Sequence, residues 1–156
     1  VGFSLKAYMS EKITIGAKEW CSLPDLGIKL IRAKVDSGAK TTALHADNLE
    51  KFTKNREKWV RFSLRPLKKT KPDYEIFCQA KLLDKRIIKS SNGLKEERYV
   101  IQTTLILGTQ SYPIEITLTN RDLMGFNMLL GREAMIGRNI IDCELNYKLG
   151  KPKLKK

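Results

Sequence analysis

Residues 34–47 read KVDSGAKTTALHAD, a segment in which Asp36, Ser37 and Gly38 follow a short apolar run and precede an extended one. Asp and Gly are ordinary turn residues, because an Asp side chain bonds nearby backbone and Gly accepts a positive φ. The segment therefore fits either a plain turn between two strands or a carboxylate carried at the tip of a loop. The rest of the chain has to decide between these two interpretations.

The composition predicts one ordinary folded domain. The chain has 156 residues, of which 42% are hydrophobic and 30% charged, which allows a real core and argues against wholesale disorder. We expect a flexible N-terminal segment (1–11), a folded domain (12–147) and a basic C-terminal tail (148–156). No apolar run approaches the ~20 residues that span a bilayer. We therefore expect no membrane insertion and a cytoplasmic location, or a periplasmic one if an upstream signal has been removed.

The cysteines and the single histidine favour structural roles over metal binding. Cys21, Cys78 and Cys143 are far apart and odd in number, which argues against a disulfide framework and for buried cysteines in a reducing compartment. His45 and Asp47 form a weak H-x-D pair, but one histidine poorly supplies a closed zinc site. We therefore predict neither a metal nor a cofactor.

The charge of the chain predicts an anionic partner. Thirty Lys and Arg residues against 17 Asp and Glu residues leave a formal charge of +13. Such a surface attracts nucleic acid, anionic membrane or acidic peptides. Part of the excess lies in the tail KLGKPKLKK, which we expect to be solvated.

Strand patterns dominate the chain. WVRFSLRP (59–66) alternates, with Val60, Phe62 and Leu64 on one face. SYPIEITLT (111–119) alternates in the same way, and RYVIQTTLIL (98–107) leads into it through the short turn GTQ. Long alternating strands joined by short turns are typical of a small barrel or sandwich.

Two segments have a less regular pattern. YEIFCQAKLLDKRIIKS (74–90) indicates a long extended arm, so that residues 74–107 form a hairpin with its tip near Ser91, Asn92 and Gly93. GREAMIG (131–137) predicts a short helix between two apolar strands. Residues 41–52 also carry some helical periodicity, which Thr41 and Thr42 weakly oppose.

Three segments in a fixed order carry a family resemblance: AKVDSGAKTTALHA (33–46), SSNGLKEERYV (90–100) and NMLLGREAM (127–135). Together they resemble the retroviral-type aspartic peptidases, the retropepsins. More narrowly, they resemble the bacterial family called ATP-dependent zinc proteases, associated with RimK, an ATP-grasp ligase that adds glutamates to a ribosomal protein. The resemblance covers roughly residues 12–146. It implies a mainly β, retropepsin-like closed barrel with a flap hairpin over the substrate and one short helix.

The resemblance implies that Asp36 is the catalytic carboxylate of an active-site loop that also contains Ser37, Gly38 and Ala39, and that Gly131 permits close packing beneath this loop. Hydrolysis by this route needs two carboxylates that share one proton, one to activate water and one to polarise the carbonyl. The chain has a single Asp-Ser-Gly motif, so we expect a symmetric homodimer to supply the second. A monomer would need another acid, such as Glu96 or Glu97.

The same resemblance suggests a peptide substrate rich in glutamate. Lys40, Arg98 and Arg132 lie in or beside the matched segments and are candidates to bind substrate carboxylates. Each also has a plainer interpretation. Lys40 would simply be exposed, Arg98 would pair with an acidic residue across the sheet, and Arg132 would form a structural ion pair. The chain contains no HExxH and no GxxxxGK[ST] segment, so we expect neither zinc nor ATP dependence.

A different class of function remains open. The chain is alternatively a non-catalytic basic β-barrel that binds nucleic acid, the ribosome or acidic proteins. It lacks an RNP1-like aromatic pattern and a KH-type GxxG loop, which disfavours nucleic acid.

Overall fold

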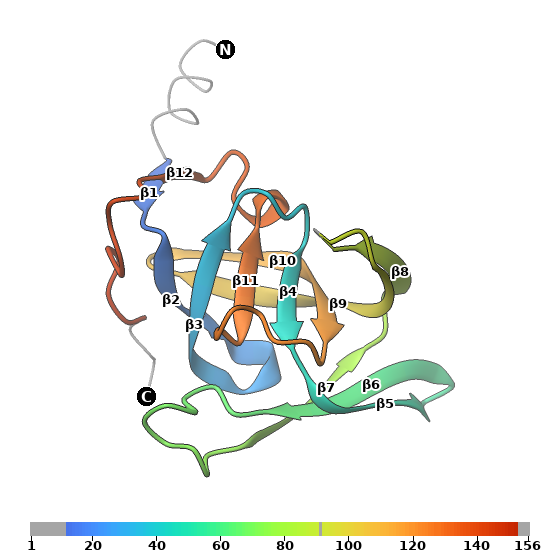
Figure 1. Cartoon of the computed structure of the whole chain (residues 1–156). Helices are drawn as coiled ribbons and strands as arrows, with labels where there is room; N and C mark the ends of the chain where they lie inside the picture. The colour runs from blue at the N-terminus through green and yellow to red at the C-terminus, as the bar shows by residue number, and fades with distance from the viewer. Residues whose placement is uncertain (1–11, 91, 153–156) are drawn as a thin grey trace, which may run out of the picture.

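The computed structural model describes residues 12–90 and 92–152 of the chain, so the predicted N-terminal segment (1–11), the end of the tail (153–156) and Ser91 at the hairpin tip lie outside it. Strands dominate the described part, as expected (Figure 1). The strands are β1 (Ile13–Ile15), β2 (Lys18–Leu23), β3 (Ile28–Asp36), β4 (Thr42–His45), β5 (Asp47–Lys54), β6 (Glu57–Leu64), β7 (Ile76–Lys81), β8 (Asp84–Lys89), β9 (Lys95–Leu107), β10 (Gln110–Thr119), β11 (Met128–Gly131) and β12 (Asn139–Ile141). None of the helical turns in this part is long and apolar enough to cross a membrane.

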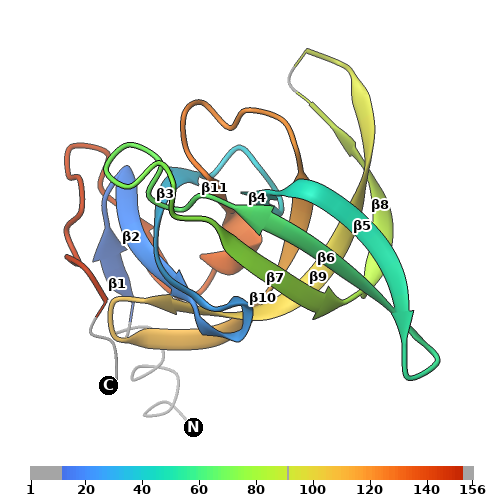
Figure 2. The same cartoon turned by 90° about the horizontal axis from the view of Figure 1, so that it is seen from below.

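The main sheet has seven strands in the order β10-β4-β11-β3-β2-β9-β8, and β9 also pairs with β10. These pairings return to their starting strand, which agrees with the expected barrel. The pairing between β2 and β9 is the shortest in this ring, because it consists of the single residue pair Ser22 and Ile106. A separate three-stranded sheet, β5-β6-β7, lies along one end of this ring (Figures 1 and 2).

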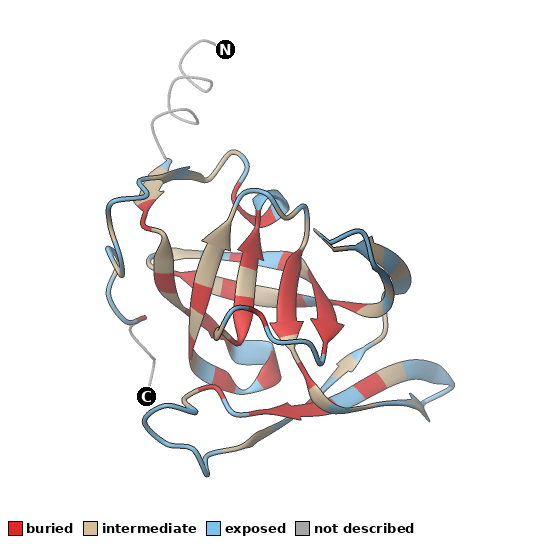
Figure 3. Ribbon diagram, in the orientation of Figure 1, coloured by how far each residue is buried: buried red, intermediate tan, exposed pale blue. Residues whose placement is uncertain are grey.

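The core forms from the alternating strands, as their pattern predicts. Tyr112, Ile114, Ile116 and Leu118 of β10 are all buried. Val60, Phe62 and Leu64 of β6 are buried too. Figure 3 shows that β4, β10 and β11 consist mostly of buried residues.

The predicted hairpin exists, but its first arm is shorter than expected. β8 pairs antiparallel with β9 from Asp84 and Val100 to Lys89 and Lys95. Residues 76–81 instead form β7, which pairs with β6. The chain passes from one sheet to the other between Leu82 and Leu83. The Leu82 amide donates to the Lys58 carbonyl of β6, whereas the Leu83 amide donates to the Val100 carbonyl of β9. The arm over 74–83 was therefore wrongly assigned, while the tip at Asn92 and Gly93 is confirmed.

Two local predictions are decided by the structure. Residues 42–45 and 47–54 are strands, so the helical alternative for 41–52 is wrong. The helix after Gly131 is confirmed as a short 3-10 turn, η2 (Arg132–Ala134). A second such turn, η1 (Pro24–Leu26), was not predicted; it begins at a proline and ends at Gly27, whose φ is +75°.

Candidate active site

Asp36 is the last residue of β3, at the point where three strands meet. β11 runs parallel to β3 and places Gly131 beside Asp36. The same strand pairs antiparallel with β4 on its other side. The loop 37–41 therefore leaves one neighbour of β11 and returns as the other, at the end of the sheet where η2 begins (Figure 1).

The start of this loop is folded back on the Asp36 side chain. The Gly38 amide donates to Asp36 Oδ1 at 3.0 Å, and the Ala39 amide donates to the Asp36 carbonyl at 3.2 Å. An Asp side chain that bonds backbone two residues ahead is a common turn device. Here it also fixes the direction of the carboxylate, while Ser37 and Gly38 remain exposed.

The residues after β11 hold the rest of the loop from beneath. The Arg132 amide donates to the Ala39 carbonyl at 2.8 Å, and the Glu133 amide donates to the Lys40 carbonyl at 3.1 Å. The Arg132 guanidinium adds contacts to the Ser37 and Gly38 carbonyls at 3.5 and 3.3 Å. Arg132 therefore contacts the backbone of three loop residues.

Gly131 and Thr42 close the contact between β11 and the loop. The Gly131 amide donates to the Thr42 hydroxyl at 3.1 Å. A Cβ atom at position 131 would lie 2.5 Å from the Thr41 carbonyl carbon, far inside any normal separation. The prediction that Gly131 permits close packing beneath the loop agrees with this geometry, whereas the part played by Thr42 was not predicted.

Tyr112 supports η2 from the core. Its hydroxyl donates to the Ala134 carbonyl at 2.7 Å. Burial raises the pKa of Tyr112 to about 12, so the hydroxyl keeps the proton that this bond requires. The chain of contacts thus runs from the core through η2 to the loop that carries Asp36.

This arrangement agrees with a family match. The family model described as "Retropepsin-like aspartic endopeptidase RimB" matches residues 14–152. The chain belongs to the RimB-like family. The match includes Asp36, the hairpin and the β11–η2 segment.

Curated relatives of this RimB-like chain carry a different name. Proteins of Parasynechococcus marenigrum and Desulfotalea psychrophila, each named "Probable alpha-L-glutamate ligase", are 47% and 52% identical over 91% and 89% of the chain. The chain spans about 30% of the length of each. A crystal structure of a Legionella pneumophila protein of unknown function has a TM-score of 0.70 and 27% identity, covering 87% of this chain and 97% of that one.

The basic residues proposed to bind substrate are all engaged within the chain. Lys40 Nζ lies 3.7 Å from Glu133 Oε1, with both side chains exposed. Arg98 Nε lies 2.9 Å from Glu96 Oε2, and the Arg98 side chain is only 10% exposed. Its acidic partner is thus two residues away on the same strand rather than across the sheet. Arg132 bonds loop carbonyls rather than a carboxylate.

Glu96 and Glu97, the acids considered for a monomeric site, also have partners. Glu96 accepts from the Thr119 hydroxyl at 3.0 Å and contacts Arg98 and Arg121. Glu97 Oε1 lies 3.3 Å from Lys85 Nζ.

The H-x-D pair of this RimB-like chain is a hydrogen-bonded pair. His45 Nε2 lies 2.8 Å from Asp47 Oδ1, and His45 Nδ1 lies 3.1 Å from the Arg121 carbonyl oxygen. Within residues 12–90 and 92–152, no group of three or more His, Cys, Asp or Glu side chains is arranged to hold a metal.

The cysteines divide into two kinds. Cys21 and Cys78 are buried as predicted, whereas Cys143 is exposed, so the prediction was wrong for Cys143. Burial raises the pKa of the Cys78 thiol to about 12. Burial, with the nearby Glu19 carboxylate, also raises the pKa of Cys21. Both buried thiols are therefore kept protonated and unreactive at neutral pH.

Proposed function

We propose that this RimB-like chain is an aspartic peptidase in which Asp36 activates a water molecule. The observation that carries the proposal is the loop geometry. The Asp36 carboxylate accepts the Gly38 amide, and the backbone of the same loop is held by Arg132 and Glu133. A carboxylate used as a general base must be held in place relative to the bond it attacks.

The proposed reaction needs two such carboxylates sharing one proton. One ionised Asp36 takes a proton from water as the water oxygen attacks the peptide carbonyl carbon. The protonated Asp36 polarises the carbonyl oxygen, and a proton then passes to the departing nitrogen as the C–N bond breaks. Two like charges a few ångströms apart cannot both ionise, which favours the singly protonated pair.

A second copy of the chain is the proposed source of the second Asp36. The Asp-Ser-Gly motif occurs once. Glu96 and Glu97, the acids nearest to a flap in sequence, are already engaged by basic partners. A two-fold axis beside the loop 37–41 would bring two equivalent carboxylates together without any further residue.

The hairpin β8–β9 is the proposed cover of the cleft. Its free end extends beyond the other strands of the main sheet (Figure 2). Ile87 and Leu94 on it are large apolar side chains that are 68% and 55% exposed. A bound peptide or the partner subunit would shield them from water.

We further propose an acidic, glutamate-rich peptide as the substrate. The chain carries a formal charge of +13, which concentrates anionic peptides near its surface. The relatives named as glutamate ligases contain a segment like this chain and are about three times as long. A ligase that adds glutamates and a peptidase that removes them would act on the same kind of acidic tail.

The test is the variant Asp36→Asn, assayed on a glutamate-tailed peptide beside a neutral and a basic peptide. The substitution is nearly isosteric but removes the group that accepts the proton from water. We expect hydrolysis to be lost while the melting temperature is largely unchanged. We also expect the wild-type chain to prefer the acidic peptide, and this preference to shrink at high salt.

The outcomes separate the two parts of the proposal. Undiminished hydrolysis by Asp36→Asn would defeat the mechanism. Equal cleavage of all three peptides would defeat the acidic substrate and leave the peptidase standing.

A further inference from the structure

The strand that ends at Asp36 also carries a line of basic side chains. Successive residues of a strand face opposite sides, and Ile31 and Ala33 of β3 point into the core, where both are fully buried. Arg32, Lys34 and Asp36 therefore share the outer face. On β2, Trp20 is paired with Arg32, and Lys18 is paired with Lys34.

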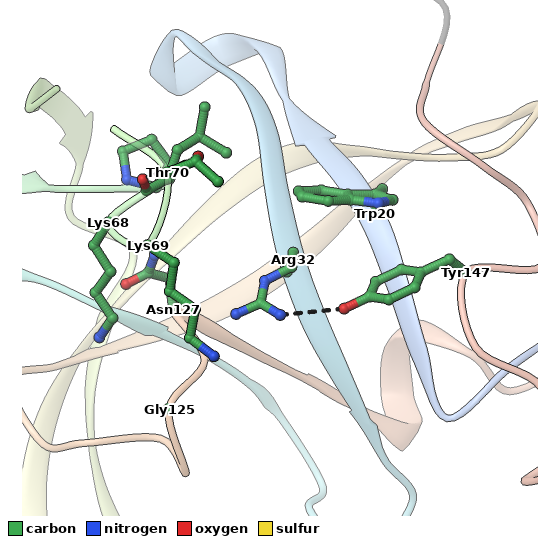
Figure 4. Close-up of a pocket in the computed structure, with 10 residues that line it drawn as sticks. Trp20, Arg32, Lys68, Lys69, Thr70, Gly125, Asn127 and Tyr147 are labelled. Atoms are coloured by element: carbon green, nitrogen blue, oxygen red, sulfur yellow. Dashed lines mark hydrogen bonds between the residues drawn. The ribbon is translucent and has the colours of Figure 1, made fainter. Parts of the chain in front are cut away.

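A pocket opens on this face beside Arg32. It has a volume of about 240 Å³ and lies between β2, β3, the loop 66–70 and the end of the β10–β11 loop. Figure 4 shows Arg32 hydrogen-bonded to Tyr147 on one side of the pocket and Lys68, Lys69 and Thr70 on the other. Three of its lining residues are basic and none is acidic.

Several basic side chains elsewhere in the chain are paired with carboxylates, whereas those of the pocket are not. Lys40, Arg61, Arg65, Lys81, Lys85, Arg86, Arg98 and Arg121 each form an ion pair. Within residues 12–90 and 92–152, no carboxylate lies within ion-pair distance of Arg32, Lys34, Lys68 or Lys69. No nearby carboxylate therefore compensates the positive charge of the pocket.

The aromatic rings around the pocket are already in use. Arg32 lies 5.0 Å from the Phe126 ring centroid, with Lys18 at 5.7 Å. Trp20 contacts Tyr147 at 5.6 Å between ring centroids and Lys151 at 5.3 Å. Proteins that bind single-stranded nucleic acid offer open aromatic faces for base stacking. The pocket therefore fits compact anionic groups such as carboxylates better than nucleobases.

The pocket lies within reach of a peptide held at Asp36. Arg32 is four residues from Asp36 on one strand, about 13 Å at ~3.3 Å per residue. An extended peptide covers the same distance in about four residues.

We propose that this pocket is an anion-binding site, separate from the loop at Asp36, which holds a carboxylate side chain of an acidic peptide about four residues from the bond placed at Asp36. This proposal rests on the proposed peptidase function. Arg32, Lys68 and Lys69 bind the carboxylate, and Lys34 lies between the two sites. The site favours acidic chains long enough to occupy both positions.

The test measures binding in the Asp36→Asn background, where the peptide is not consumed. Fluorescein-labelled peptides of eight and of three glutamates are titrated, and fluorescence anisotropy is recorded at low salt. Lys68→Gln with Lys69→Gln removes two exposed charges of the pocket. Lys51→Gln with Lys58→Gln is the matched control, because these lysines are also exposed and lie on the separate sheet.

We expect the pocket variant to bind the eight-glutamate peptide about threefold to tenfold more weakly, as two exposed ion pairs would contribute. The three-glutamate peptide should bind both variants alike, since it is too short to span the two sites. An equal loss in the control pair, or no binding of the long peptide to the parent protein, would overturn the proposal. Tighter binding of a single-stranded oligonucleotide that depends on Lys68 and Lys69 would overturn it in favour of nucleic acid.

Failure of the peptidase function would look different. A wild-type chain that binds the long peptide through Lys68 and Lys69 but hydrolyses no peptide would remove the catalytic proposal alone.

Discussion

Gly131 packs directly against Thr41, since a Cβ atom at position 131 would lie 2.5 Å from the Thr41 carbonyl carbon and 2.8 Å from its oxygen. The obstacle is backbone rather than a flexible side chain. The loop that carries Asp36 must therefore move if position 131 gains any side chain. This contact makes Gly131 a determinant of the site although it does not touch the Asp36 carboxylate.

We predict that Gly131→Ala destabilises the protein by about 1–3 kcal/mol, the usual cost of overpacking, and abolishes most hydrolysis. Urea unfolding gives the first quantity and the peptide assay the second. An unchanged unfolding midpoint with full activity would contradict this prediction, because it would show that the loop 37–41 accommodates the added methyl group without loss of stability or hydrolysis.

Arg132 is predicted to be a positioning residue. Its guanidinium contacts the Ser37 and Gly38 carbonyls, so Arg132→Gln should loosen the loop. We expect kcat to fall about tenfold or more, because a displacement of ~1 Å near the chemistry can cost about 10²-fold. The fall should be equal for acidic and neutral peptides.

A direct role of Arg132 in substrate binding predicts a different result. In that case KM would rise for the acidic peptide alone, and the preference for acidic peptides would shrink. Comparing kcat and KM for the two peptides distinguishes these roles, and Arg132→Lys should restore neither the second carbonyl contact nor full kcat.

Glu19 is predicted to fasten both ends of the described chain to the barrel. It is fully buried and accepts the amides of Gly16, Lys148 and Leu149 at 2.7, 3.1 and 3.1 Å. Glu19→Ala leaves these donors without an acceptor, at about 1–3 kcal/mol for each that is buried. We expect a clearly lower urea midpoint, whereas Glu144→Gln, an exposed carboxylate, should change it little. Equal midpoints would remove this role.

The sequence predicts the fold best where one face of a strand is buried. The alternation in β6 and β10 places Val60 and Ile116 correctly, because burial imposes the period of two. The same reasoning fails at Leu82 and Leu83, where the sequence pattern predicts one uninterrupted strand of the hairpin. There the chain changes sheets through hydrogen bonds to Lys58 and Val100, and such partners leave no local pattern.

For the candidate site too, the sequence predicts the features that have a local pattern and misses those that depend on distant partners. The Asp36 loop was recognisable from its short motif, and the glycine beneath it from its place before a short helix. The role of Arg98 could not be predicted in this way. A basic residue in a matched segment has the same sequence pattern whether it binds a substrate or pairs with a residue of its own chain such as Glu96. The buried role of Glu19 could not be predicted either, since a charged residue in a strand normally indicates an exposed position.

The shared dyad makes a quantitative prediction about mixed dimers. If each active site needs Asp36 from both subunits, a dimer of one wild-type chain and one Asp36→Asn chain is inactive. When equal amounts of the two chains are unfolded together and refolded, random pairing leaves about a quarter of the dimers wholly wild-type. We therefore expect about a quarter of the activity given by the same total amount of wild-type chain.

The competing mechanism predicts twice that value. If one Asp36 suffices with an acid from its own chain, half of the sites survive and the activity falls only to about half. Glu144→Gln chains, which differ at an exposed carboxylate away from the loop, replace Asp36→Asn in the control and should preserve the activity. Light scattering on each refolded mixture checks that pairing has occurred. Activity at half of the wild-type level in a sample of confirmed dimers would exclude the shared dyad, because only independent sites respond in direct proportion to the wild-type fraction.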